Sequence, residues 1–263
     1  MVFDRANAKR EARRIIREVK PSPIKVVLIY LLLTDGISMV VDFFLSNPFS
    51  ESMSYITQGY DPVEVYSYVF SGPLSMMAVF ISLLMAFYNM VMTFGGKSYM
   101  LHLARGQEGE ISDLFDGFGL VAKIVATELL SMLYIFFWSM LFVIPGIVAS
   151  FAYSQAVYCL LDDPDISPFE ALRRSKMLMR REKFNFFVLD LSFIGWELLA
   201  IVCTAGPAWL INQVMPGMGT VVEEVLLLLF NLWLVPYKWI VFSRFYSDLR
   251  LAQYGENGPR VEF

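Results

Sequence analysis

The sequence predicts an all-α protein: a polytopic membrane helical bundle with six transmembrane helices, both termini in the cytoplasm, and short amphipathic helices at the interface. Of the 263 residues, 57% are hydrophobic and only 17% are charged, whereas soluble domains average about 25% charged residues. Several stretches of about 20 residues carry few charges, which is the length that a helix needs to cross about 30 Å of hydrocarbon. A soluble chain of this composition would expose large apolar patches.

The apolar segments divide the chain into three regions. Residues 1–23 are predicted to form a basic amphipathic interfacial helix, and 244–263 a cytoplasmic tail. Pro145 and Gly146 do not easily continue a helix, so the third and fourth spans are predicted to form a tight hairpin. The transmembrane domain, 24–243, is predicted to contain spans at 24–45, 73–94, 121–143, 147–161, 186–210 and 222–243.

The basic residues predict the orientation. All 21 lysines and arginines fall in the N-terminal segment through Lys25, in the connections 95–123 and 162–185, and at the C-terminal end from Lys238 onward. The alternate connections carry none: 46–72, 144–146 and 211–221. Because cytoplasmic loops of membrane proteins are rich in Lys and Arg, both termini are predicted to be cytoplasmic.

Two basic segments are predicted to bind lipid headgroups. Residues 4–20 place an apolar stripe on one side of a helix, which suits a helix that lies in an anionic leaflet. Residues 167–184 begin with a capping box, in which Ser167 caps the helix and Glu170 reaches back to the cap. The predicted headgroup-binding residues are Arg10, Arg13, Arg14, Arg17, Arg173, Arg174, Arg180 and Arg181. Nucleic acid is not an expected partner, because no nucleic-acid-binding module accompanies these charges.

Polar residues inside the predicted spans form a second set of candidates. A central acidic residue costs about 2.5–3.5 kcal/mol on membrane-insertion scales, so each one needs a reason. At 1.5 Å per residue, Asp35, Glu197 and Asn231 are predicted to share a level near the midplane, with Glu128, Asp190 and Lys238 nearer the cytoplasm. These residues either bridge helices or line a polar cavity for a cation, a proton or a cationic or zwitterionic substrate, and the sequence leaves both alternatives open.

Other chemistry has little support in the sequence. His102 is the only histidine, and Cys159 and Cys203 lie in apolar segments without metal-ligand spacing. Asp190 and Glu197 are about 10 Å apart along one helix, which is too far to share a proton as an acid pair. We therefore expect neither an enzyme nor a cofactor or metal site.

One long stretch resembles a known family. "IPGIVASFAYSQAVYCLLDDPDISPFEALRRSKMLM" and the following "FFVLDLSFIGW" resemble the bacterial integral membrane family called domain of unknown function nine-seven-five. The features that carry the resemblance are Pro145–Gly146, Asp163–Ile166, Glu170–Ala171 and Leu191–Trp196. More distantly, the layout is similar to the membrane domain of some glycerophosphodiester phosphodiesterases. The resemblance implies a multi-pass protein of the bacterial cytoplasmic membrane and supplies no catalytic residue.

The sequence thus leads to two hypotheses about function. The first is a non-enzymatic membrane protein that organises or senses the bilayer, or assists a partner complex, through basic helices that bind anionic lipid. The alternative is a small-solute or ion transporter, in which proton coupling would use the midplane carboxylates. The expected partners are the bilayer and its anionic lipids, with a second membrane protein or a second copy of the chain as further candidates.

Overall fold

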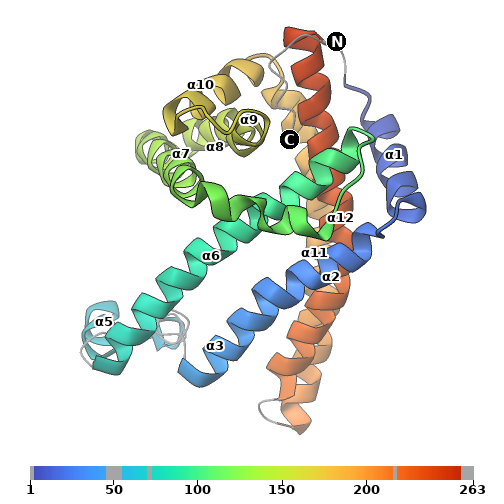
Figure 1. The fold of residues 1–263 in the computed structure, drawn as a ribbon. Helices are drawn as coiled ribbons and strands as arrows, with labels where there is room; N and C mark the ends of the chain where they lie inside the picture. The colour runs from blue at the N-terminus through green and yellow to red at the C-terminus, as the bar shows by residue number, and fades with distance from the viewer. Residues whose placement is uncertain (1–2, 46–54, 70–72, 216–217, 256–263) are drawn as a thin grey trace.

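The computed structural model describes residues 3–45, 55–69, 73–215 and 218–255, and in these residues it contains helices and connections but no strand (Figure 1). The all-α prediction is confirmed. The elements are α1 (Arg5–Glu18), α2 (Pro23–Leu31), η1 (Leu32–Gly36), α3 (Ile37–Leu45), α5 (Pro62–Val69), α6 (Pro73–Ala104), η2 (Ile111–Leu120), α7 (Val121–Leu141), α8 (Val143–Tyr153), α9 (Ala156–Asp162), α10 (Pro168–Leu178), α11 (Lys183–Val214) and α12 (Met218–Tyr254).

Six helical segments of the described chain are long and apolar enough to cross a membrane, so the prediction of six spans is also confirmed. Several helices run well beyond the predicted spans, because they continue past the apolar stretch into a protein-packed region. The six segments are Pro23–Val41, Met76–Ala104, Ile111–Leu141, Val143–Asp162, Lys183–Val214 and Met218–Tyr254.

The α11–α12 hairpin forms the long axis of the molecule (Figure 1). With 37 residues, α12 is the longest helix, and at 1.5 Å per residue it measures about 55 Å. It includes residues 244–254, which were predicted to belong to a cytoplasmic tail. Phe245 and Tyr246 are buried there in the core, so this stretch is part of the fold, while 256–263 lie outside the described residues.

The N-terminal helix α1 is amphipathic, as predicted, but its apolar stripe faces the protein. Asp4 caps the helix by accepting a hydrogen bond from Asn7 N at 3.0 Å. The stripe packs on α12 and α2, and its buried members are Ala8, Ala12, Ile15 and Ile16. The basic face remains on the outside, so α1 presents charge to its surroundings without inserting apolar side chains into a leaflet.

The helix α6 continues through Gly95 and Gly96 to Ala104, although its span was predicted to end at residue 94. The two glycines allow close packing and do not end the helix. A Cβ atom on Gly95 would lie 2.0 Å from the carbonyl oxygen of Leu114 in η2, and one on Gly96 would lie 2.4 Å from the ring of Trp239. The short helix η2 therefore lies directly on the backbone of α6.

The hairpin of α7 and α8 turns at Phe142, three residues before the predicted Pro145–Gly146 turn. Pro145 falls in the first turn of α8, where a missing N–H leaves no helical hydrogen bond unmade. A Cβ on Gly146 would lie 2.0 Å from Ser139 Oγ, so this glycine permits close contact between the two helices.

A break separates α8 from α9, and a side chain of α10 stabilises the break by hydrogen bonds. Ser175, which is fully buried on α10, donates a hydrogen bond to the Ala152 carbonyl at 2.8 Å and accepts one from Gln155 N at 3.1 Å. One hydroxyl thus satisfies two backbone groups that the interrupted helix leaves unpaired. All seven residues of α9 are buried, so this segment is held by protein on every side.

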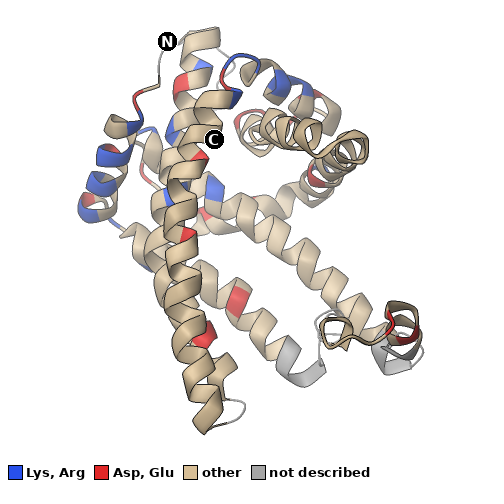
Figure 2. Ribbon diagram, turned by 180° about the vertical axis from the view of Figure 1, so that it is seen from behind, with Lys and Arg blue, Asp and Glu red and all other residues tan. Residues whose placement is uncertain are grey.

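Charge divides the molecule into two parts. Figure 2 shows Lys and Arg on α1, α10 and the adjoining ends of the long helices, whereas the far ends of α3, α6, α11 and α12 carry none among the described residues. We call these the basic half and the apolar half. The main core cluster, which includes Tyr99, Leu189, Phe193, Tyr237 and Phe245, lies toward the basic half. The apolar half instead exposes large side chains such as Val202, Trp209, Leu210 and Leu229.

Candidate functional site

The predicted intramembrane residues Asp190, Glu197 and Lys238 come together between α11 and α12. Lys238 Nζ lies 2.6 Å from Glu197 Oε1 and 3.4 Å from Asp190 Oδ1. Seven residues separate the two carboxylates on α11, so both lie on one face and bracket the single ammonium group. Lys238 Nζ also lies over the ring of Phe242, 5.4 Å from the ring centre. The trio carries a net charge of −1 when all three groups are ionised.

The helix lengths give the distance of this trio from the far end of α11. About 17 residues separate Glu197 from the end of α11 at Val214, which corresponds to about 26 Å of helix, close to the full hydrocarbon thickness of about 30 Å. The helix α1 lies at the same level, because Lys9 Nζ donates to Ser192 Oγ at 2.6 Å and Arg13 to Tyr237 Oη at 3.4 Å.

The other two residues predicted at the midplane lie apart from this trio. Asp35 is in η1, a single π-helical turn that interrupts the first span. Beside it, Tyr88 Oη on α6 donates to the carbonyl of Leu33 at 3.0 Å. Asn231 is on α12, about two helical turns from Lys238 toward the apolar half. No hydrogen bond or ion pair among the described residues joins Asp35, Asn231 and Glu197.

Glu128, which was predicted to share an inner level with Asp190 and Lys238, lines a separate pocket. This pocket has a volume of about 290 Å³ and lies between α6, α7 and α9. Asn89 and Lys97 of α6 line it together with Glu128 of α7. The predicted inner level of polar residues is therefore divided between two separate places in the fold.

A third polar cluster, absent from the predicted set, surrounds Asp162 at the end of α9. Its carboxylate receives Arg105 Nη1 at 2.7 Å, Arg250 Nε at 3.0 Å and the Tyr246 hydroxyl at 2.6 Å. The Asp162 side chain is only 8% exposed. Because these partners come from α9, α12 and the end of α6, the cluster ties three distant parts of the chain together. No local spacing links residues 105, 162 and 250, so the sequence carried no pattern for it.

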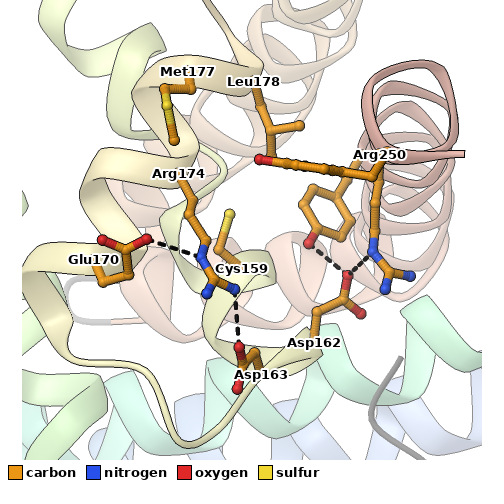
Figure 3. A pocket seen from close by; sticks show the side chains of 10 residues that line it. Cys159, Asp162, Asp163, Glu170, Arg174, Met177, Leu178 and Arg250 are labelled. Carbon is orange, nitrogen blue, oxygen red and sulfur yellow. Dashed lines mark hydrogen bonds and ion pairs between the residues drawn. The ribbon is translucent and has the colours of Figure 1, made fainter. Parts of the chain in front are cut away.

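A pocket of about 190 Å³ lies beside this cluster, between α9, α10 and α12 (Figure 3). Arg174 crosses it, donating to Asp163 Oδ2 at 2.9 Å and to Glu170 Oε1 at 3.2 Å. Three carboxylates and two arginines line the pocket, and both arginines already form ion pairs within the protein. The arrangement fixes α10 against α9 and α12 and does not offer an unpaired cation to an anionic ligand.

At the N-terminus of α10, the predicted Ser167 cap is present but the predicted capping box with Glu170 is not. Ser167 Oγ accepts from Glu170 N at 3.2 Å. Glu170, however, does not complete the predicted capping box and instead binds Arg173 at 2.7 Å and Arg174 at 3.2 Å. The hydrogen bonds from Arg173, more than those from Arg174, lower the pKa of the Glu170 carboxyl below its usual value.

The predicted headgroup-binding arginines lie on the basic half, on two separate helices. Arg10, Arg13, Arg14 and Arg17 are exposed on α1, although Arg13 also stacks on Tyr237 with its guanidinium carbon 5.6 Å from the ring centre. Arg173, Arg180 and Arg181 are exposed on or just after α10. Arg174 is the exception, because it is half-buried between Asp163 and Glu170.

Comparison with known proteins matches part of the chain to one family. Residues 140–253 match the family model described as Protein of unknown function (DUF975). We call this matched segment the DUF975 region. The resemblance seen in the sequence is thus confirmed over this segment, whereas the more distant likeness to glycerophosphodiester phosphodiesterases has no support. No curated protein and no solved structure matches the chain.

The DUF975 region contains most of the polar clusters described above. Asp162, Arg250 and Tyr246 lie within it, as do Lys238 and both of its carboxylate partners. The α1 arginines lie outside it, as do Lys97 and Glu128. In the described part of the chain, no group of three or more His, Cys, Asp or Glu side chains is arranged to hold a metal ion. The geometry of the DUF975 region is that of ion pairs that lock helices together.

Proposed function

We propose that this protein is a non-enzymatic, multi-pass protein of the bacterial cytoplasmic membrane that binds anionic lipid headgroups and thereby organises or senses the bilayer, or assists a partner membrane protein. Both termini lie in the cytoplasm in this proposal. The observation that carries it is the set of exposed arginines on α1 and after α10, on helices whose apolar faces are already buried in the protein.

The distribution of charge supports this orientation. In the described residues, every Lys and Arg lies toward the basic half (Figure 2), and cytoplasmic faces of membrane proteins are enriched in these residues. A Lys or Arg close to an anionic leaflet adds about 1 kcal/mol of attraction. Glu11 pairs with Arg14 and Glu170 with Arg173, so each carboxylate offsets part of the positive charge on its helix, while Arg10, Arg17, Arg180 and Arg181 add exposed charge.

The lipids that copurify with the protein test the proposal. The protein is purified in a mild detergent, and the ratio of anionic to zwitterionic phospholipid retained is measured by mass spectrometry. We expect the triple variant Arg10→Gln, Arg14→Gln, Arg17→Gln to retain several-fold less anionic lipid. The matched control, with Lys at the same three positions, keeps the charge and should keep the lipid. An unchanged ratio in the Gln variant contradicts the proposal.

Transport of a small solute or ion is the alternative function. The observation that favours it is the π-helical turn that contains Asp35, because π-helical turns within α-helices occur frequently at functional sites. A transport pathway requires water at Asp35 in at least one state. In a Cys159→Ala, Cys203→Ala background, Asp35→Cys should then react with a small membrane-impermeant thiol reagent. Leu32→Cys is the control, because Leu32 is an exposed apolar residue of the same turn. Absence of labelling at position 35 from both faces contradicts a pathway there.

A further inference from the structure

The pocket between α6, α7 and α9 differs from the other polar clusters because its charged groups are not paired with each other. Asn89, Thr93 and Lys97 follow one another at four-residue intervals, so they line one face of α6. Glu128 lines the same pocket from α7, and Phe94, Ile124 and Val157 supply apolar walls. The volume of about 290 Å³ holds about ten waters or non-hydrogen atoms at ~30 Å³ each.

The polar groups of this pocket have unused capacity to bind. Asn89 Nδ2 donates to Ser38 Oγ at 3.4 Å, but Asn89 Oδ1 is buried and has no hydrogen-bond partner among the described residues. Thr93 Oγ1 is 3.1 Å from Tyr30 Oη. Within the described part of the chain, neither Lys97 nor Glu128 takes part in an ion pair with N···O within 4.0 Å. Lys238, in contrast, forms ion pairs with two carboxylates.

Glu128 interacts electrostatically with Lys97 across the pocket, but the two groups are too far apart to form an ion pair. A charge withdrawn from water is destabilising by several kcal/mol unless it is paired and hydrogen-bonded. A single ion would contact only one of the two groups, and the attraction between them across the gap supplies neither group with a hydrogen bond. A molecule that carries both a cation and an anion would satisfy both at once.

We infer that this pocket binds a small zwitterion, with its protonated amine facing the Glu128 carboxylate and its anionic group facing the Lys97 ammonium. Asn89 Oδ1 accepts a further hydrogen bond from the ligand. The inference does not depend on lipid binding by the basic half, because none of its residues belongs to that surface.

Two sources share this chemistry. One is a soluble zwitterion, such as an amino acid or an amino phosphate. The other is the headgroup of a zwitterionic phospholipid, for which the pocket also has a suitable apolar end. Ala86 lines the pocket about 16 Å along α6 from Lys97, and it is exposed toward the apolar half, where an acyl chain would continue.

Calorimetric titration of the detergent-solubilised protein tests the inference. The soluble probes are O-phosphoethanolamine and β-alanine, with ethanolamine as the cation-only and glycerol phosphate as the anion-only comparison. A parallel arm compares phosphatidylethanolamine with phosphatidylglycerol in nanodiscs. We expect saturable binding of a zwitterionic probe, at least tenfold tighter than either singly charged comparison. Binding of a soluble probe identifies a solute, and binding of phosphatidylethanolamine alone identifies a headgroup.

Variants show whether the binding uses this pocket. Lys97→Met and Glu128→Gln should each weaken binding at least tenfold, whereas Lys176→Met, which removes an exposed lysine of α10, should leave it unchanged. Asn89→Leu provides an uncharged third variant if either charge variant fails to fold. The inference is overturned if no zwitterion binds, if ethanolamine or glycerol phosphate binds equally well, or if the pocket variants bind like the unmodified protein.

Discussion

Lys238 Nζ lies 2.6 Å from Glu197 Oε1, and this ion pair joins α11 to α12 where the two helices leave the apolar half. The same ammonium group is 3.4 Å from Asp190. Two carboxylates on an apolar helix thus share one lysine from the neighbouring helix. This arrangement explains why a segment as apolar as 186–202 tolerates two acidic residues.

Removal of this lysine should destabilise the α11–α12 hairpin. The Glu197 side chain is 43% exposed, so we expect a coupling energy between Lys238 and Glu197 of about 1 kcal/mol, the upper end for accessible pairs. The measurement is a double-mutant cycle of Lys238→Met and Glu197→Gln by equilibrium unfolding in mixed micelles. Asp190→Asn should couple less strongly to Lys238, because its contact is longer. Additive effects at positions 238 and 197 would exclude an energetic role for the pair.

Asp162 should be far more sensitive to substitution than its neighbour Asp163. Asp162→Asn leaves the half-buried Arg105 and Arg250 without their common buried carboxylate, and breaking a buried ion pair costs up to about 3–5 kcal/mol. Asp163 binds Arg174 with a side chain that is 23% exposed, so Asp163→Asn should cost about 1 kcal/mol or less. The comparison uses the free energy of unfolding of both variants, and similar losses would show that burial of Asp162 is not decisive.

The Glu170 ion pairs should give a small acid-dependent contribution to stability. Arg173 and Arg174 hold the folded-state pKa of Glu170 below the ordinary value of 4.5. The contribution is therefore fully present above pH 4.5 and is lost as the pH falls through the folded-state pKa. We expect Glu170→Gln to be about 0.5 kcal/mol less stable at neutral pH, with a difference that shrinks in acid.

The matched control for Glu170 removes its partners. In an Arg173→Gln, Arg174→Gln background, Glu170→Gln should no longer have an acid-dependent effect on the free energy of unfolding. A pH-dependent difference of unchanged size in that background would assign the effect to another partner.

The spans and the charge asymmetry could be predicted from the sequence, because hydropathy and the positions of Lys and Arg are local signals. The full length of α11 could not be predicted, because this helix continues past the apolar stretch into a region packed by protein. The number of residues beyond the hydrocarbon depends on what packs there, and here α1 packs beside Ser192. The Phe142 turn was misplaced for a similar reason, since Pro145 is as compatible with the first turn of a helix as with a loop.

The polar sites likewise divide into those that local sequence could predict and those that depend on the tertiary fold. Asp190 and Glu197 stood out because acids are rare in apolar helices. Asp162 did not, because it lies at the end of a span, where an acid is unremarkable. Its importance comes from Arg105 and Arg250, which only the tertiary fold brings together. Lys97 was counted only as a basic residue of a connection, because α6 was expected to end before it.

The close contact between α6 and η2 gives the last prediction. Gly95→Ala places a Cβ 2.0 Å from the Leu114 carbonyl oxygen. This oxygen belongs to the backbone, which cannot move aside as easily as the end of a flexible side chain. The clash should cost about 1–3 kcal/mol, which outweighs the ~1 kcal/mol that alanine gains over glycine within a helix. Gly195→Ala on α11 is the matched control, because nothing lies within 4 Å of its Cβ. The same substitution should therefore lower the melting temperature at position 95 and raise it at position 195. A rise at both positions would mean that η2 does not pack directly on the α6 backbone.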